Sequence, residues 1–342
     1  MKIEHELVLL SVISNKTEEE AKKIDDILSK KIDWIEVAGI VMNHRLSGYL
    51  YNGLTKEQRL IMPKELRKSF EMLVLGQSFR QETLNKYITE LDETLKKGKV
   101  RFAGLKGIIY GASLYQKGTR RSNDLDLLVY EEDLSELDCL LRSVGYIQSN
   151  MPDGKLVEAS KKEKLIQRMN YHDLVPYVKA IDDDYISIDI NFLFDGKDNL
   201  IDEKVFKRGT RIYEGAQYKF IGLEFDTNLA FLIAHFYREA TGKLWLNNKR
   251  NLILYKIVDI VNYIRQYEKE INIEDFLELL DELNLIEKTL YTFLTINKFY
   301  KELEFVNRCI EKISIKYSDI YQKFINDSIF GQYYEDSFNL GR

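Results

Sequence analysis

Residues 100–130 read VRFAGLKGIIYGASLYQKGTRRSNDLDLLVY, and the interpretation of the whole chain starts from this stretch. Near its end, Asp124 and Asp126 stand one residue apart at the start of an apolar run that continues to Val129. Side chains alternate between the two faces of a β-strand, so both carboxylates point to the same side, roughly 6–7 Å apart. Two like charges at the edge of a buried strand are unfavourable unless a cation lies between them. A divalent metal ion is the simplest such cation.

A strand, a short helix and a second strand are predicted within this stretch. Residues 100–105 have the pattern of a strand, which Lys106 and Gly107 end. Residues 108–115 predict a short helix, because their apolar positions share one helical face. Residues 125–130 predict the second strand. The change in periodicity at residue 100 therefore marks the start of a small mixed sheet.

A third acidic residue lies on a later β-rich segment. Residues 185–194 read YISIDINFLF, and the alternation places Asp189 and Asn191 on one face. Residues 169–178 are expected to supply the strand that pairs with this segment. We therefore expect Asp189 to join the pair at residues 124 and 126.

The sequence on both sides of the sheet is predicted to be helical. Residues 63–97 are rich in Leu, Glu and Lys and suit one long helix or two stacked helices. We predict an α+β chain with three parts: an N-terminal helical region at 1–96, a mixed-sheet core at 97–225 and a C-terminal helical domain at 226–342.

Composition limits the classes of protein that the chain can represent. A length of 342 residues suits two or three domains, and the isolated Cys139 and Cys309 argue against a disulfide framework. The opening residues do not resemble a signal peptide, and no apolar run approaches the ~20 residues of a membrane span. We expect a cytoplasmic protein with no membrane partner. The net charge of −5 argues against bulk attraction to nucleic acid but leaves a local basic groove open.

The residues around the acidic pair suit the chemistry of a nucleoside triphosphate. Two metal ions about 4 Å apart can neutralise a triphosphate and align the attacking and leaving oxygens, and three carboxylates suffice to hold them. Gly107, directly after a strand, allows backbone amides to approach phosphate oxygens. Arg120, in the basic segment between the two strands, can bind phosphate through two hydrogen bonds.

These residues resemble the nucleotidyltransferase superfamily of DNA polymerase β and kanamycin nucleotidyltransferase. The chain is more closely similar to the bacterial uncharacterised nucleotidyltransferase family, over most of its length. The central similarity lies in Leu105-Lys106-Gly107, Tyr115, Gly118, Arg120, the run DLDLLV at 124–129, and Gly145-Tyr146. Weaker similarities lie in Asp33-Trp34, His44, the run SIDIN at 187–191, His235 and Asp259-Ile260.

The resemblance implies a role for each matching residue. Asp124, Asp126 and Asp189 would be the catalytic residues and the ligands of Mg²⁺, with two ions expected. Asp189 would lie near the attacking group and help to take its proton. Gly107 would contact the phosphates of the NTP, and Arg120 and Lys106 would neutralise them.

Two features depart from the family pattern or leave an alternative open. Gly107 is followed by Ile108, where the superfamily usually has a second small residue, so the run Gly111-Ala112-Ser113 is an alternative for the phosphate loop. We prefer Gly107 because the predicted strand ends there. Relatives often carry a histidine where this chain has Asn191.

Other polar residues have both a structural and a functional interpretation. Lys249 lies in a basic cluster that either completes the triphosphate pocket or is simply solvated. His172 either reaches the site or is structural. His235 either faces the cleft or makes a hydrogen bond between domains, and we expect His44 to be structural.

The sequence therefore predicts a Mg²⁺-dependent nucleotidyltransferase that moves a nucleoside monophosphate from an NTP to an acceptor hydroxyl and releases pyrophosphate. A small molecule or a peptide-like product is favoured as the acceptor over tRNA. The alternatives are a toxin-like enzyme of the same chemistry that acts on tRNA or protein, and a nucleotide-binding regulator without catalysis. The oligomeric state and the preferred NTP are left open.

Overall fold

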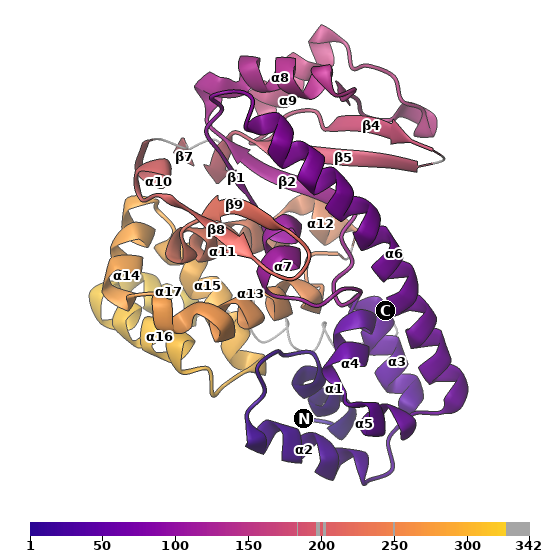
Figure 1. Cartoon of the computed structure of the whole chain (residues 1–342). Coiled ribbons are helices and arrows are strands. Elements are labelled where there is room, and N and C mark those ends of the chain that lie inside the picture. The colour runs from indigo at the N-terminus through magenta and orange to yellow at the C-terminus, as the bar shows by residue number, and fades with distance from the viewer. Residues whose placement is uncertain (183, 196–198, 201–202, 249, 326–342) are drawn as a thin grey trace. The chain divides into compact units, whose positions relative to one another are not determined.

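The computed structural model describes residues 1–182, 184–195, 199–200, 203–248 and 250–325, which divide into two compact units. The helical unit combines Met1–Gly76 with the chain from Leu232 onward, and the sheet unit is Gln77–Phe231. Two helices, α6 (Lys64–Leu95) and α11 (Phe225–Thr241), each contribute residues to both units. Of the two arrangements predicted for residues 63–97, one long helix or two stacked helices, the structure has the single long helix α6 (Figure 1).

The sheet unit is built on a mixed sheet with the strand order β3-β4-β5-β2-β1-β9-β8. A separate pair consists of β6 and β7. The strands are β1 (Phe102–Gly104), β2 (Asp124–Val129), β3 (Ile147–Gln148), β4 (Tyr177–Ile181), β5 (Asp184–Asn191), β6 (Leu193–Asp195), β7 (Asn199–Leu200), β8 (Thr210–Glu214) and β9 (Lys219–Leu223). The helices are α7 (Lys106–Ser113), α8 (Leu134–Ser143), α9 (Lys161–Asn170) and α10 (Glu203–Lys207), with 3₁₀ turns at Glu131–Asp133 and Pro152–Gly154.

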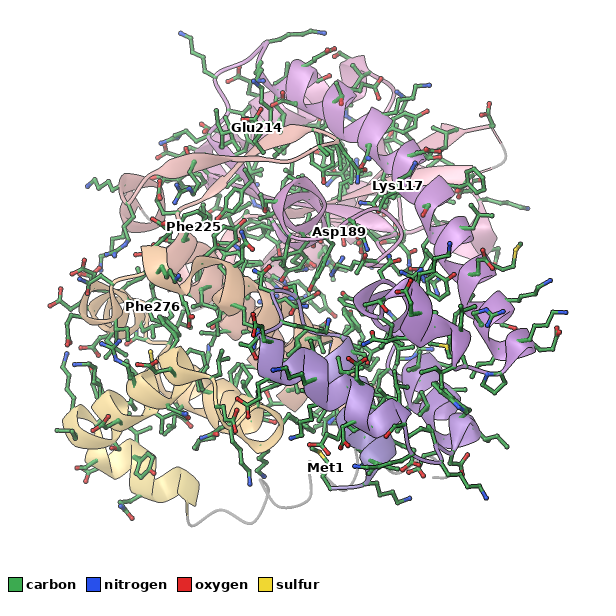
Figure 2. The ribbon with its side chains drawn as sticks, turned by 60° about the horizontal axis from the view of Figure 1, so that its bottom comes forward. Met1, Lys117, Asp189, Glu214, Phe225 and Phe276 are labelled. Atoms are coloured by element: carbon green, nitrogen blue, oxygen red, sulfur yellow. The ribbon has the colours of Figure 1, made fainter. Side chains whose placement is uncertain are left out.

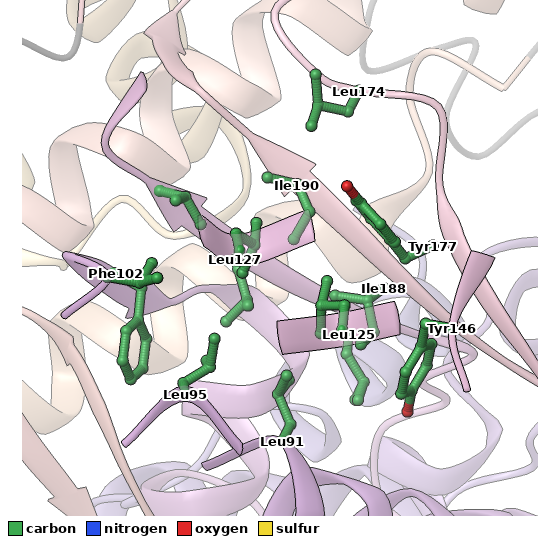
Figure 3. Packing of buried hydrophobic residues seen from close by; sticks show 14 of the residues in the cluster. Leu91, Leu95, Phe102, Leu125, Leu127, Tyr146, Leu174, Tyr177, Ile188 and Ile190 are labelled. Carbon is green, nitrogen blue, oxygen red and sulfur yellow. The ribbon is translucent and has the colours of Figure 1, made fainter. Parts of the chain in front are cut away.

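Alternation along β2 and β5 decides which side chains enter the core. The residues that enter it are Leu125, Leu127 and Val129 of β2 and Ile186, Ile188 and Ile190 of β5. They share one hydrophobic cluster with residues of α6, such as Leu84, Ile88, Leu91 and Leu95, and with Leu134, Leu137 and Leu141 of α8 (Figure 3). Because neighbours along a strand point to opposite faces, Asp124 and Asp126 of β2 and Asp189 of β5 lie on the other face of the sheet.

One sequence prediction in this unit is wrong. Residues 169–178 do not form a single strand, because Met169 and Asn170 end helix α9 and the strand β4 begins only at Tyr177. Helix α9 starts with a capping box, in which Ser160 and Glu163 bond each other's backbone amide. The strand that pairs with β5 is therefore shorter than expected, and residues 171–176 form a connection beside β5.

The helical unit brings together helices from both ends of the chain. Its elements are α1 (Ile3–Ser11), α2 (Glu18–Leu28), α3 (Trp34–Asn43), α4 (Ser47–Gly53), α5 (Lys56–Leu60), α12 (Lys243–Asn247), α13 (Leu254–Tyr267), a 3₁₀ turn at Glu268–Glu270, α14 (Ile273–Glu282), α15 (Ile286–Phe299), α16 (Glu304–Lys316) and α17 (Ser318–Ile325). The buried Tyr49 hydroxyl donates to Asp259 Oδ1 over 2.7 Å.

The predicted α+β class, a mixed sheet flanked by helices, is confirmed. Within the described part of the chain, no helix combines the length and the apolar character that crossing a membrane requires.

Candidate active site

The register between β2 and β5 brings the three predicted acidic residues together. The two strands are parallel, and Asp126 lies directly opposite Asp189, while Asp124 lies opposite Ser187. Facing residues of paired strands point to the same side of a sheet, so all three carboxylates share the face that turns away from the core. Figure 2 labels Asp189 within the sheet unit. The structure thus assembles residues that lie more than sixty positions apart in sequence.

Lys106, which follows strand β1, contacts Asp126 of this acidic group. β1 runs antiparallel to β2, and the backbone amide of Leu105 donates to the carbonyl of Asp126 over 2.9 Å. Lys106 follows with a φ of +39°, a left-handed conformation that is costly for a residue with a side chain. Its Nζ lies 2.7 Å from Asp126 Oδ1. This ion pair is well shielded, since the side chains are 17% and 7% exposed.

Gly107 and Arg120 lie side by side next to this ion pair. A Cβ added to Gly107 would stand 3.0 Å from Ser122 Oγ and 3.4 Å from Arg120 Nη1. Arg120 Nη1 also donates to Ser122 Oγ over 2.8 Å, and its guanidinium carbon lies 4.9 Å from the ring centre of Tyr110. A cationic group is therefore held beside the backbone turn that follows β1.

The alternative glycine loop occupies a different setting. Gly111 lies inside helix α7, where an added Cβ would stand 2.6 Å from the hydroxyl oxygen of Tyr218. That hydroxyl donates to the carbonyl of Ile108 over 2.6 Å. The small size of Gly111 thus serves packing within the sheet unit. Gly107 lies in the first turn of α7, and β1 ends earlier than predicted, at Gly104.

The three carboxylates give the site a surplus of negative charge. Burial, with added repulsion from Asp126 and Asp124, raises the pKa of Asp189 to about 7. The pKa of Asp124 is also raised, first because the protein around the carboxylate displaces water from it and then because of Asp126, although part of its surface stays exposed. Lys106 acts against both shifts, and Arg120 acts against that of Asp124. A further cation bound here would relieve the remaining repulsion.

A comparison with protein families decides what kind of protein carries this site. The sequence model of the uncharacterised nucleotidyltransferase family matches residues 30–301. The chain belongs to this family. It is a nucleotidyltransferase, an enzyme that transfers a phosphorus-containing nucleotidyl group. Comparisons with curated proteins and with solved structures give no match.

Nucleotidyltransferases generally use an NTP and a divalent metal ion, and the donor set of this nucleotidyltransferase fits such an ion. Carboxylate oxygens are the ligands that hard divalent cations prefer, and three of them share one face of the sheet. Among the described residues, however, no three acidic, histidine or cysteine side chains are already grouped as a metal-binding cluster. Asp126 Oδ1 is instead paired with the ammonium group of Lys106.

Helix α6 supports the site of this nucleotidyltransferase through Arg80, which sequence analysis missed. Arg80 forms an ion pair with Asp184, and its Nη2 donates to the carbonyls of Tyr185 over 3.0 Å and Asn123 over 3.4 Å. It thus joins the beginnings of β5 and β2, just before Asp124. No local pattern marks Arg80, because its partners lie far along the chain.

Asp173 is a second residue that sequence analysis missed. It forms an isolated antiparallel bridge with Asn191, and its charge contributes to the raised pKa of Asp189. The neighbouring His172 accepts hydrogen bonds from the backbone amides of Phe192 and Leu193 at its carbonyl. Residues 172 and 173 therefore lie beside the end of β5. The sequence signal for this residue is the tripeptide YHD at 171–173, in which an acid directly follows a histidine.

The remaining candidate residues lie in structural settings or outside the description. Asn191 is buried, and its Nδ2 donates to the carbonyl of Leu127 over 3.3 Å. His44 is buried and accepts from the Leu254 amide, which confirms its structural role. His235 contacts Arg238 and Glu239 of its own helix at 3.0 and 3.3 Å. Lys249 lies outside the described residues.

Proposed function

We propose that this nucleotidyltransferase moves a nucleoside monophosphate from an NTP to an acceptor hydroxyl, with Mg²⁺ as its metal and pyrophosphate as the second product. The observation that carries the proposal is the register of β2 and β5, which places Asp126 opposite Asp189 with Asp124 on the same face. Carboxylates gathered in this way repel each other, and a protein gains from such an arrangement when it binds cations there.

The turn after β1 supplies the binding site for the triphosphate. Gly107 has no side chain to keep phosphate oxygens away from the first turn of α7, and helix N-termini favour anions. Arg120 lies within reach of the same turn and can donate two hydrogen bonds to phosphate. Lys106 adds a second positive charge one residue before the glycine.

The three aspartates prepare the reacting groups. Asp124 and Asp126 would hold two Mg²⁺ ions together with Asp189, and these ions would neutralise the triphosphate and align the attacking and leaving oxygens. Asp189 would also orient the acceptor hydroxyl and take up its proton.

The charge around Asp189 favours an acceptor that is not a polyanion. Asp173 adds a fourth carboxylate beside β5, and the chain as a whole carries a net charge of −5. A nucleic acid brings a phosphate for every nucleotide, and each phosphate would need a cationic partner. We therefore propose a hydroxyl on a small molecule or a peptide as the acceptor.

Product analysis with labelled nucleotides tests the reaction. The enzyme is incubated with Mg²⁺, each α-labelled NTP and panels of small hydroxyl compounds and peptides, and label transfer and pyrophosphate release are followed. Asp126→Asn is expected to abolish both. Asp182→Asn is the matched control, since residue 182 has a φ of +44° in an exposed turn, which asparagine tolerates.

Three outcomes separate the proposal from its alternatives. Transfer to tRNA that weakens steeply with salt would replace the proposed acceptor class. NTP binding without any transfer or pyrophosphate release would favour a nucleotide-binding regulator. Equal activity of Asp126→Asn and the wild type would remove the acidic face from the catalytic mechanism.

A further inference from the structure

Lys106 occupies a position that a metal ion would also need. Its Nζ lies 2.7 Å from Asp126 Oδ1, and Asp126 is the carboxylate between the other two, since Asp124 precedes it on β2 and Asp189 faces it on β5. A divalent ion bound through the same oxygen would stand within a few ångströms of the ammonium group. At that separation, and away from bulk water, like charges repel strongly.

The backbone commits Lys106 to this contact. Lys106 is the first residue of α7 and holds a φ of +39°, while the amide of Leu105 is fixed to the carbonyl of Asp126. Unfavourable backbone conformations persist where the surrounding structure enforces them, and they are frequent at functional sites. The backbone of Lys106 is thus fixed beside Asp126, while rotation about the four bonds of its side chain allows the ammonium group to move away.

The turn at Gly107 offers a second position for the ammonium group when phosphate is bound there. Gly107 and Arg120 adjoin each other at the turn where we place the triphosphate. The guanidinium group of Arg120 repels the ammonium group of Lys106. A bound triphosphate reverses the sign of the potential at this turn and makes it a favourable place for the ammonium group.

We propose that Lys106 is an internal counter-ion that blocks metal binding at Asp126 until a triphosphate arrives and then moves to the phosphates. This inference rests on the proposed function of the site. It makes metal and nucleotide bind with positive coupling: metal alone binds weakly, and each ligand raises the affinity for the other by the same factor. A metal ion is then retained chiefly when its substrate is present.

Metal titrations of two lysine variants test the inference without relying on activity. Mn²⁺ binding is measured by electron paramagnetic resonance and calorimetry, alone and with an α,β-methylene NTP. Lys106→Met is expected to bind Mn²⁺ alone about tenfold more tightly than the wild type, because a nearby like charge is gone. The factor by which the nucleotide raises the affinity for Mn²⁺ is expected to fall towards one.

Two controls keep the result interpretable. Lys117→Met removes a lysine from the connection between α7 and β2. Lys117 pairs with Glu82 of α6, and its loss is expected to leave Mn²⁺ affinity unchanged. Lys106→Gln, which keeps a polar side chain without the charge, is expected to behave as Lys106→Met does. Far-ultraviolet circular dichroism checks that each variant is folded.

The failure of this inference differs from the failure of the proposed function. If Lys106→Met and Lys106→Gln bind Mn²⁺ alone no more tightly than the wild type, while Asp126→Asn abolishes Mn²⁺ binding, the counter-ion role is overturned and the metal site stands. If Asp126→Asn leaves Mn²⁺ binding unchanged, both the counter-ion role and the proposed metal site are overturned.

Discussion

At the residue scale, the raised pKa of Asp189 links the site to the stability of the fold. The folded-state pKa is about 7, whereas an aspartate in an unfolded chain titrates near ~3.9. Between these values the folded protein binds the extra proton, so the contribution of Asp189 to stability is lost as the pH rises towards about 7. An ionised Asp189 in metal-free buffer is therefore a destabilising group at pH 8.

The variant Asp189→Asn tests this charge effect. In buffer with EDTA, its free energy of unfolding is expected to exceed that of the wild type by about 1–2 kcal/mol at pH 8 and by little at pH 5. Urea denaturation at several pH values measures the difference. Asp182→Asn, in an exposed turn, serves as the control. A constant difference for Asp189→Asn would contradict a raised pKa.

Arg120 is the residue whose loss should most affect nucleotide binding. Arg120→Ala is expected to weaken NTP binding by about 10- to 100-fold, and Arg120→Lys by less, since lysine keeps the charge without the paired donors. Equilibrium binding of a fluorescent NTP measures both. Arg121→Ala is the matched control, because the neighbouring arginine is exposed and its Nε donates to Asn123 Oδ1. Equal losses for Arg120→Ala and Arg121→Ala would point to general electrostatics instead of a specific contact.

At the element scale, the β8–β9 hairpin and helix α7 meet so closely that only glycine fits at residue 215. A Cβ there would stand 1.8 Å from the carbonyl oxygen of Ala112. Gly215→Ala is expected to destabilise the protein by about 1–3 kcal/mol, because the hairpin has to move away from the helix. Gly76→Ala is the opposite case. Gly76 lies inside α6, and a Cβ added there would meet no neighbouring atom within 4 Å, so the substitution should stabilise the protein by about 0.5–1 kcal/mol. Thermal and urea unfolding measure the stability of both variants. Changes in the free energy of unfolding with the same sign in both would contradict this account.

The elements also show how far a sequence alone leads. The apolar run that follows Asp124 was enough to predict a strand with Asp124 and Asp126 on one face, because that pattern is local. The register that sets Asp126 opposite Asp189 is not local, and neither is the contact of Arg80 with Asp184. Residues 169–178 were predicted as the strand that pairs with residues 185–194. The capping box at Ser160 instead begins a helix that extends to Asn170, and this competing signal is local.

At the scale of the whole molecule, the proposed catalytic residues all belong to the sheet unit. Hydrogen exchange tests whether this unit is sufficient for ligand binding. Adding Mn²⁺ and a non-hydrolysable NTP is expected to protect residues 102–107, 118–129 and 186–192, with no such protection in Asp126→Asn. New protection of the helical unit in the wild type would show that residues outside 77–231 also respond to the ligands.

The sheet unit is a single continuous stretch placed between two segments of the helical unit, and this order has a consequence on the ribosome. All strands of the sheet have been synthesised once Phe231 has emerged, and domains generally fold as units during synthesis. The helices before Gly76 emerge first yet cannot complete their unit, because Tyr49 meets Asp259 only after a further 210 residues. The helices before Gly76 are therefore synthesised before the sheet unit but can complete their own unit only after it.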